Sequence, residues 1–79
     1  MTELQKAEVD TYQSILGELD LRARTLRNEL SDAQAEAQRA PFEERLHAEI
    51  RMFAIRERLR AVIDLQEWCL QQQTQRSTP

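Results

Sequence analysis

The chain contains one cysteine, one glycine, two prolines and four aromatic side chains among its 79 residues. A single cysteine excludes a disulfide framework and a cysteine-rich zinc site. A single glycine leaves no glycine-rich loop of the kind that cradles a phosphate. So few turn-forming residues also argue against a sheet built from several hairpins. The sequence therefore predicts an all-α protein of long helices, and its length fits a single domain over 1–79.

No stretch of about 18 apolar residues is present, so the sequence predicts no transmembrane span and no membrane partner. The N-terminal residues lack the basic and apolar regions of a signal peptide. A lone Cys69 suits a reducing compartment, and we expect a cytoplasmic location. The net charge of −3 argues against a general nucleic-acid binder. Nine arginines in 21–60 nevertheless leave room for a local basic surface.

The first half of the chain has a regular apolar repeat. Its apolar residues recur at alternating steps of three and four, which is the a/d pattern of a coiled coil and predicts one long helix. Ala, Leu, Glu, Gln and Arg dominate the other positions, and all of them favour helix. Gly17 lies outside the repeat, where it is either a tolerated surface residue or the site of a kink. The repeat comprises Val9, Tyr12, Leu16, Leu19, Ala23, Leu26, Leu30, Ala33 and Ala37.

The repeat stops at Ala40-Pro41, where proline would break a helix but is well placed to begin one. Glu43 and Glu44 then suit the first turn of a second helix, because acidic side chains complement the helix dipole. The tail from Gln71 onward has no apolar residue, so we expect it to fray. The predicted boundaries are a helix over about 3–38, a turn at 39–41, a helix over about 42–73 and a frayed tail at 74–79.

The apolar repeat changes phase across the proline. A continuous, kinked helix would place Glu44, Arg51 and Arg58 in the apolar seam. The best seam after the proline is out of phase with the first, which favours a true turn and hence an antiparallel, coiled-coil-like hairpin of two helices. This second seam comprises Ala48, Met52, Ile55, Leu59, Val62, Gln66 and Cys69.

The second helix carries more apolar residues than one seam needs. A helix that is apolar on more than one side is buried on more than one side, and a chain this small rarely builds a sufficient core alone. We therefore expect a homodimer that forms a four-helix bundle. The predicted self-interface comprises Ile50, Ala54, Ala61, Leu65 and Trp68.

A further apolar sector lies near the predicted turn. Leu46 and Phe53 fall away from both apolar sets of the second helix, and aromatic and arginine side chains often anchor interfaces. We therefore predict a surface for a different protein that comprises Leu46, Phe53, Arg51, Arg58 and Arg22.

Three arrangements could in principle support chemistry, and none does so convincingly. Glu44 and His47 have the spacing of a di-iron ligand pair, but the acids of the facing segment lie off the seam. Cys69 has no histidine nearby to act as a base, because His47 is about 33 Å away along the helix. Clustered acids on a thin hairpin have no concave pocket. We predict a non-enzymatic protein with no metal and no cofactor.

Three hypotheses for function follow. The first is a protein-interaction module, a small dimeric regulator, adaptor or inhibitor that binds a larger protein, of the kind found as an accessory protein of a phage or plasmid. The second is an RNA-binding four-helix bundle, by analogy of architecture alone with plasmid hairpins of the Rop type; Arg22, Arg51 and Arg58 would form its basic strip. The third is a structural subunit of a larger helical or virion assembly.

Overall fold

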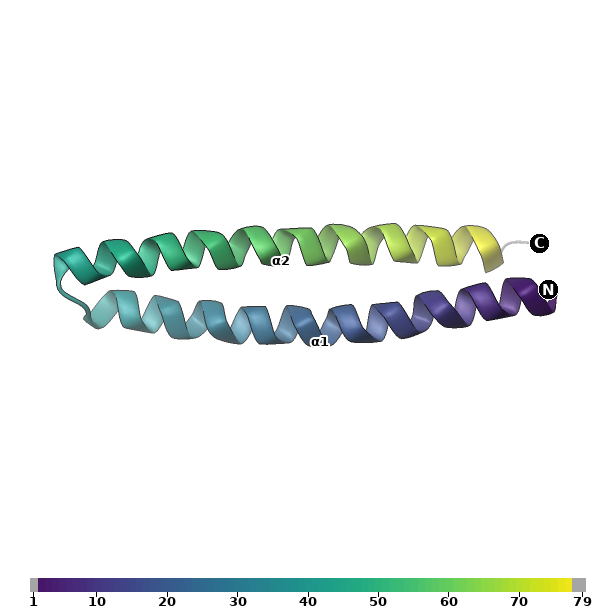
Figure 1. Ribbon diagram of the computed structural model, residues 1–79, viewed down its shortest axis with the longest axis horizontal. Helices are drawn as coiled ribbons and strands as arrows, with labels where there is room; N and C mark the ends of the chain where they lie inside the picture. The colour runs from purple at the N-terminus through teal and green to yellow at the C-terminus, as the bar shows by residue number, and fades with distance from the viewer. Residues whose placement is uncertain (1, 78–79) are drawn as a thin grey trace.

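A computed structural model describes residues 2–77 of the chain. Over these residues the chain forms two long helices, α1 (Glu3–Arg39) and α2 (Phe42–Ser77). They pack side by side as an antiparallel hairpin, with both chain termini at the end opposite the turn (Figure 1). The hairpin measures 60 × 14 × 12 Å between Cα atoms. The predicted all-α hairpin is therefore confirmed.

The turn forms because Pro41 restricts the residue before it. Ala40 has an extended backbone (φ −82°, ψ 149°), as expected before proline, and its N–H donates to the carbonyl of Glu36. The next helix then begins at Phe42, and the N–H of Arg45 donates to the carbonyl of Pro41 at 2.8 Å. Pro41 thus ends one helix and opens the other, so the turn needs only two residues.

The start of α1 is fixed by a capping box. The backbone N–H of Gln5 donates to the hydroxyl of Thr2, and the backbone N–H of Thr2 donates to the side chain of Gln5. This reciprocal pairing satisfies two backbone donors at the helix start.

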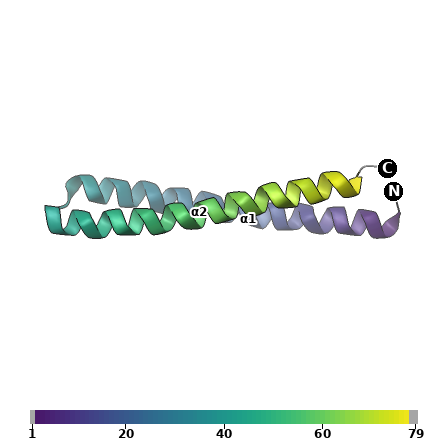
Figure 2. The ribbon, with the colours of Figure 1, turned by 90° about the horizontal axis from the view of Figure 1, so that it is seen from above.

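The two predicted seams pack against each other and form the core. Ala23 and Ala33 have no exposed surface, and Ile55 is 3% exposed. Small side chains at this contact let the helices approach closely, and Figure 2 shows them crossing once near their middle, as coiled helices do. The core is thin, because four of its eight buried residues are alanine; the eight are Ala23, Leu26, Ala33, Ala37, Ala48, Ile55, Val62 and Cys69.

The second helix is longer than the sequence pattern predicted. We expected it to end near residue 73 and the chain to fray beyond, but α2 continues to Ser77. Its last turns are held by polar contacts: Gln73 donates to the side chain of Gln13 at 2.8 Å, and Arg76 pairs with Glu8 at 2.6 Å. The prediction of a frayed tail was therefore wrong for residues 74–77. The polar residues at the end of α2 continue its seam and lie opposite the start of α1. Residues 78 and 79 lie outside the described part of the chain.

Gly17 lies on the exposed side of α1, and a β-carbon added there would meet no atom within 4 Å. Replacing Gly17 by alanine should therefore raise the free energy of unfolding by about 0.5–1 kcal/mol, because glycine costs a helix more backbone entropy than alanine does. Urea unfolding followed by circular dichroism, at one fixed protein concentration, measures the difference. A lower stability of the Gly17→Ala protein would instead indicate that another molecule packs against this position.

Candidate protein-interaction surfaces

One long side of the hairpin carries paired charges from both helices. Arg51 Nη1 lies 3.2 Å from Glu36 Oε2, and Arg58 lines an open groove together with Arg22 and Glu29. Spacings of seven residues extend this side along both helices. We call it the shared flank; it comprises Glu8, Tyr12, Ile15, Arg22, Glu29 and Glu36 of α1 and Glu44, Arg51, Arg58, Leu65, Trp68 and Arg76 of α2.

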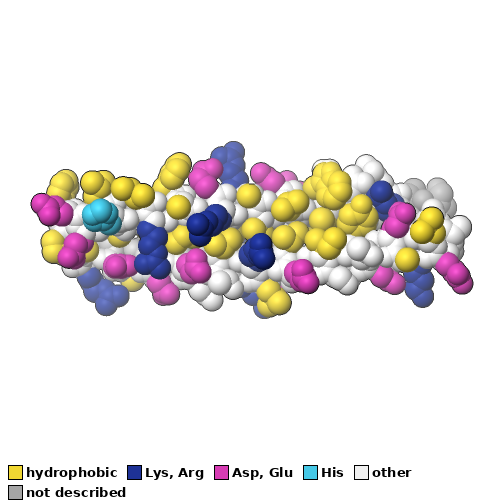
Figure 3. Space-filling model, viewed as in Figure 1, with side chains coloured by type: hydrophobic (Ala, Val, Ile, Leu, Met, Phe, Trp, Pro, Cys, Tyr) yellow, Lys and Arg dark blue, Asp and Glu magenta, His cyan; other side chains and the backbone are white. Residues whose placement is uncertain are grey.

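Apolar side chains occupy the part of the shared flank nearer to the chain termini. The rings of Tyr12 and Trp68 meet edge to face, 6.0 Å apart at 69°. Ile15 and Leu65 each follow one helical turn toward the hairpin turn and are 38% and 51% exposed. Figure 3 shows hydrophobic side chains of both helices gathered in this half of the visible face. We call Tyr12, Ile15, Leu65 and Trp68 the flank cluster.

At the end of the flank cluster nearest the chain termini, the guanidinium of Arg76 packs against Tyr12. The guanidinium of Arg76 lies 5.2 Å from the centre of the Tyr12 ring and also pairs with Glu8. Contacts of a cation with an aromatic face are favourable. Tyr12 is therefore held between Trp68 and Arg76, which fixes the shape of this end of the flank cluster.

A second apolar surface lies on the outer side of α2 near the turn. Its members follow one another at steps of four, four and three residues, which places them along one stripe of the helix. They are among the most exposed large apolar residues of the described chain, and Figure 3 shows hydrophobic side chains along this outer edge. We call this surface the outer stripe; it comprises Phe42, Leu46, Ile50 and Phe53, at 80%, 54%, 59% and 65% exposed.

The structure divides the predicted interface residues between these two surfaces. Leu65 and Trp68 belong to the flank cluster, with Ala61 exposed one turn before Leu65. Ile50 was predicted to share their surface, but it lies about 27 Å along the helix from Trp68 and within one turn of Leu46 and Phe53. Ala54, one turn beyond Ile50, is exposed between the two surfaces. Both interface roles stay predictions, but the grouping changes. Ile50 adjoins Leu46 and Phe53 near the turn, whereas Arg22, Arg51 and Arg58, predicted to share the partner surface with Leu46 and Phe53, lie on the shared flank.

Sequence reasoning missed three residues of these surfaces. The sequence pattern places Tyr12 in the seam and Ile15 beside it, where it widens the seam, and it assigns none of the three, Tyr12, Ile15 or Phe42, to an interface. The sequence placed three arginines of the shared flank together but not its flank cluster. The cluster combines residues at least 50 positions apart, so it could be found only once the two helices were known to pack in register. Phe42 lies one helical turn before Leu46, so its spacing could have identified it.

The three arginines of the predicted basic strip are interleaved with carboxylates. Arg51 pairs with Glu36, and Arg22 and Arg58 share their groove with Glu18 and Glu29. The structure thus brings the arginines to one side of the hairpin, as predicted, but that side alternates in charge. Such alternation is a weaker match to a phosphate backbone than a uniformly basic strip.

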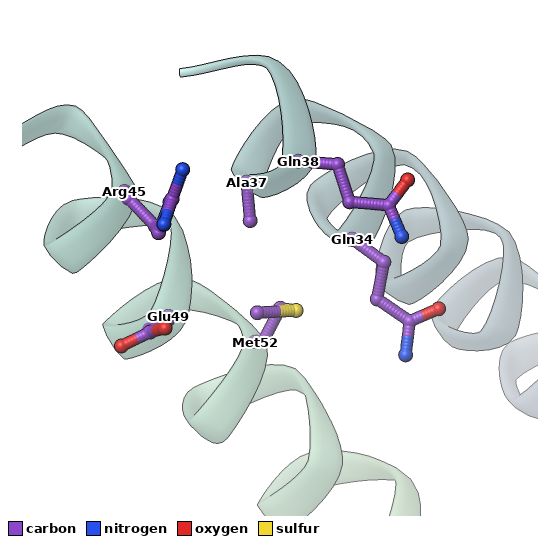
Figure 4. A pocket seen from close by; sticks show the side chains of 6 residues that line it. All are labelled: Gln34, Ala37, Gln38, Arg45, Glu49 and Met52. Carbon is purple, nitrogen blue, oxygen red and sulfur yellow. The ribbon is translucent and has the colours of Figure 1, made fainter. Parts of the chain in front are cut away.

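The grooves of the hairpin are open and shallow. One lies between the helices near the turn and is lined by Gln34, Ala37, Gln38, Arg45, Glu49 and Met52 (Figure 4). Ala37 and Met52 point toward each other there, whereas Glu49 points away from the space. Its lining offers two amides and a pair of opposite charges, with no nucleophile beside a base.

Of the residues considered for chemistry, Glu44 and His47 lie together near the turn and Cys69 lies far from both. Glu44 and His47 border an open groove with Glu36 and Arg51, and no group of three His, Cys, Asp or Glu within residues 2–77 is arranged to hold a metal ion. Cys69 is a free thiol, 2% exposed and packed in the seam.

Neither helix of the described chain has a stretch long and apolar enough to cross a membrane. Comparison of the chain with protein-family models, curated proteins and solved structures gave no match. The argument for function therefore rests on the surfaces of the hairpin itself.

Proposed function

We propose that this protein is a non-enzymatic interaction module, a small cytoplasmic hairpin that self-associates as a homodimer in a four-helix bundle and binds a larger protein as a regulator, adaptor or inhibitor. The observation that supports the proposal is the outer stripe. Four large apolar side chains on one side of α2, each more than half exposed, are costly in water unless another surface covers them. Aromatic residues at both ends of the stripe suit it to a protein interface.

The outer stripe is distinct from the core and from the flank cluster. Its residues lie on α2 alone, close to the turn, where a partner could approach without contacting α1. An amphipathic helix laid along the stripe would meet anchors at successive turns, which is a common mode of peptide recognition. The proposal therefore assigns self-association and partner binding to different parts of the same helix.

Site-specific photo-cross-linking tests partner binding. A benzophenone side chain in place of Phe53 should yield an adduct with one other protein in the native cell, and the same group in place of exposed Asn28 on α1 should not. Replacing Leu46 and Ile50 by serine should abolish that adduct while the helical content stays unchanged. If Phe53 forms adducts only with further copies of the chain, binding to a larger protein is contradicted.

The other two hypotheses stay predictions with simple tests. A gel-shift experiment at low salt detects binding of structured RNA, which should then weaken steeply as salt rises. Sedimentation distinguishes a structural subunit, because a larger assembly would exceed the mass of a dimer. The interleaved carboxylates around Arg22, Arg51 and Arg58 are the reason that RNA binding is ranked second.

A further inference from the structure

The hairpin exposes more surface than a compact protein of its mass. Its accessible area is 6220 Å², whereas a compact monomer of 9.3 kDa exposes roughly 5,000 Å². The excess of about 1,200 Å² is larger than the roughly 800 Å² that each partner buries in a stable interface. The shared flank is large enough to supply that area, because the broad side of the hairpin measures 60 × 14 Å.

The charges of the shared flank are sorted between the helices. In both ion pairs that join the helices the acid lies on α1 and the arginine on α2: Glu36 with Arg51, and Glu8 with Arg76 toward the termini. Between them, Glu29 and Arg58 line one groove. Glu44 of α2, which borders the groove of Glu36 and Arg51 next to the turn, is an exception to this sorting. The flank thus carries an acidic edge and a basic edge along most of its length, with the flank cluster between the middle and terminal pairs.

Arg22 departs from this sorting, since it is a base on α1. It lies opposite Leu65 across the hairpin, by the seven-residue spacing that places Glu29 opposite Arg58. Its aliphatic stem can cover a leucine while the guanidinium stays in water. Arg22 is therefore compatible with an apolar neighbour at this level.

We infer that a second copy of this chain covers the shared flank, related to the first by a two-fold axis parallel to the long axis of the hairpin. This axis lays α1 of each copy on α2 of the other, with both turns at the same end. Each flank acid of α1 in one copy then faces the arginine of the same level in the other copy, so Glu29 faces Arg58 and Glu36 faces Arg51. Tyr12 of each copy faces Trp68 of the other.

The alternative two-fold axis runs across the hairpin and gives a poorer fit. It would lay α1 on α1 and α2 on α2, with the turns at opposite ends. Centred on the flank cluster, it would bring Glu29 toward Glu8 and Arg58 toward Arg76 of the other copy. Like charges opposed in an interface are unfavourable and select against that arrangement. The sorting of charge therefore selects the axis parallel to the hairpin.

This inference deepens the self-association named in the proposed function and is independent of the larger partner. The outer stripe is left free in the inferred dimer, because none of its residues belongs to the shared flank that the second copy covers. Loss of the flank contact and loss of partner binding therefore have separate signatures: the first changes the mass in solution, and the second changes only the cross-link at Phe53.

The intrinsic fluorescence of the intact chain provides the first test, because Trp68 is the only tryptophan and is 50% exposed in the single hairpin. Sedimentation should show a dimer that dissociates on dilution, and the Trp68 emission should move to longer wavelength over the same concentrations. A chain that stays monomeric at the highest concentration reached overturns the inference. A mass that changes without any change in emission places the contact elsewhere and also overturns it.

Two matched double substitutions test which face of the hairpin forms the dimer interface. Replacing Leu65 and Trp68 by alanine should raise the dissociation constant of the dimer at least about 100-fold, because a two-fold interface loses each side chain twice. Replacing Leu46 and Phe53 by alanine on the outer stripe should leave it unchanged. Circular dichroism confirms that both proteins stay helical. The opposite pattern would overturn the assignment of the flank.

Spin labels test the axis without disturbing the flank. A nitroxide at Glu43→Cys, with the buried Cys69 replaced by valine, marks the exposed first turn of α2 in each copy. The inferred axis brings the two labels within a distance on the order of 30 Å, from helix spacings of about 10 Å. The axis across the hairpin, centred on the flank cluster toward the termini, separates them by more than the 60 Å length of the molecule, and that result would contradict the inference.

Discussion

Replacing Ile55 by alanine should lower the free energy of unfolding by about 2–4 kcal/mol, because it removes a branched side chain that is 3% exposed and leaves a cavity that two long helices cannot close. Ile55 packs in the cluster formed by Ala23, Leu26, Ala33 and Val62. With so thin a core, this loss is a large share of the total stability of a small domain. Urea unfolding followed by circular dichroism measures it.

Ile50 provides the matched control for this prediction. The same substitution at Ile50 removes the same atoms from the same helix, but Ile50 is 59% exposed on the outer stripe. Its replacement by alanine should change the stability by less than about 0.5 kcal/mol. Both proteins must be compared at one protein concentration, since self-association adds to the apparent stability. Equal losses of unfolding free energy at Ile55 and Ile50 would show that burial in the seam does not stabilise the hairpin.

Replacing Ala33 by leucine should destabilise the hairpin by about 1–3 kcal/mol, because it overfills the seam instead of leaving a cavity. Ala33 has no exposed surface and lies in the core cluster between the helices, so a larger side chain must push them apart. The separation should also weaken the contact between Glu36 and Arg51 one turn away. Thermal unfolding should show a lower midpoint and a broader transition.

Ala7 offers a control for the added volume. It is exposed on the outer side of α1, so the same change to leucine there meets no other helix and should leave the unfolding midpoint nearly unchanged. An Ala33→Leu protein as stable as the original would mean that α2 does not pack closely at this level. The description of the seam as a close contact built on alanines would then be wrong.

Local rules acting on particular residues explain why the fold could be predicted from the sequence. The step pattern of the first seam specifies which side of α1 is buried, and Pro41 forces Ala40 out of the helical conformation. Because the second seam restarts in a new phase, only a turn lets both seams meet. Each of these effects acts over a few neighbouring residues, so the sequence alone reveals it.

The end of α2 could not be predicted in the same way. Residues 74–77 have no apolar side chain, and a local argument gives them nothing to hold a helix. Arg76 is ordered by Glu8 and by the ring of Tyr12, which are more than 60 positions away in the chain. Only the register of the two helices brings these groups together.

The scarcity of glycine, proline and cysteine, together with the apolar repeat, determined by itself that this chain is a helical hairpin with its break at Pro41. It also determined that α2 has more apolar surface than one seam can cover. Only the tertiary structure decided which part of that surplus meets the other helix: Leu65 and Trp68 join Tyr12 and Ile15 of α1. The physical reason is that a helix fixes spacing along one segment, whereas a surface shared by two helices depends on how they pack.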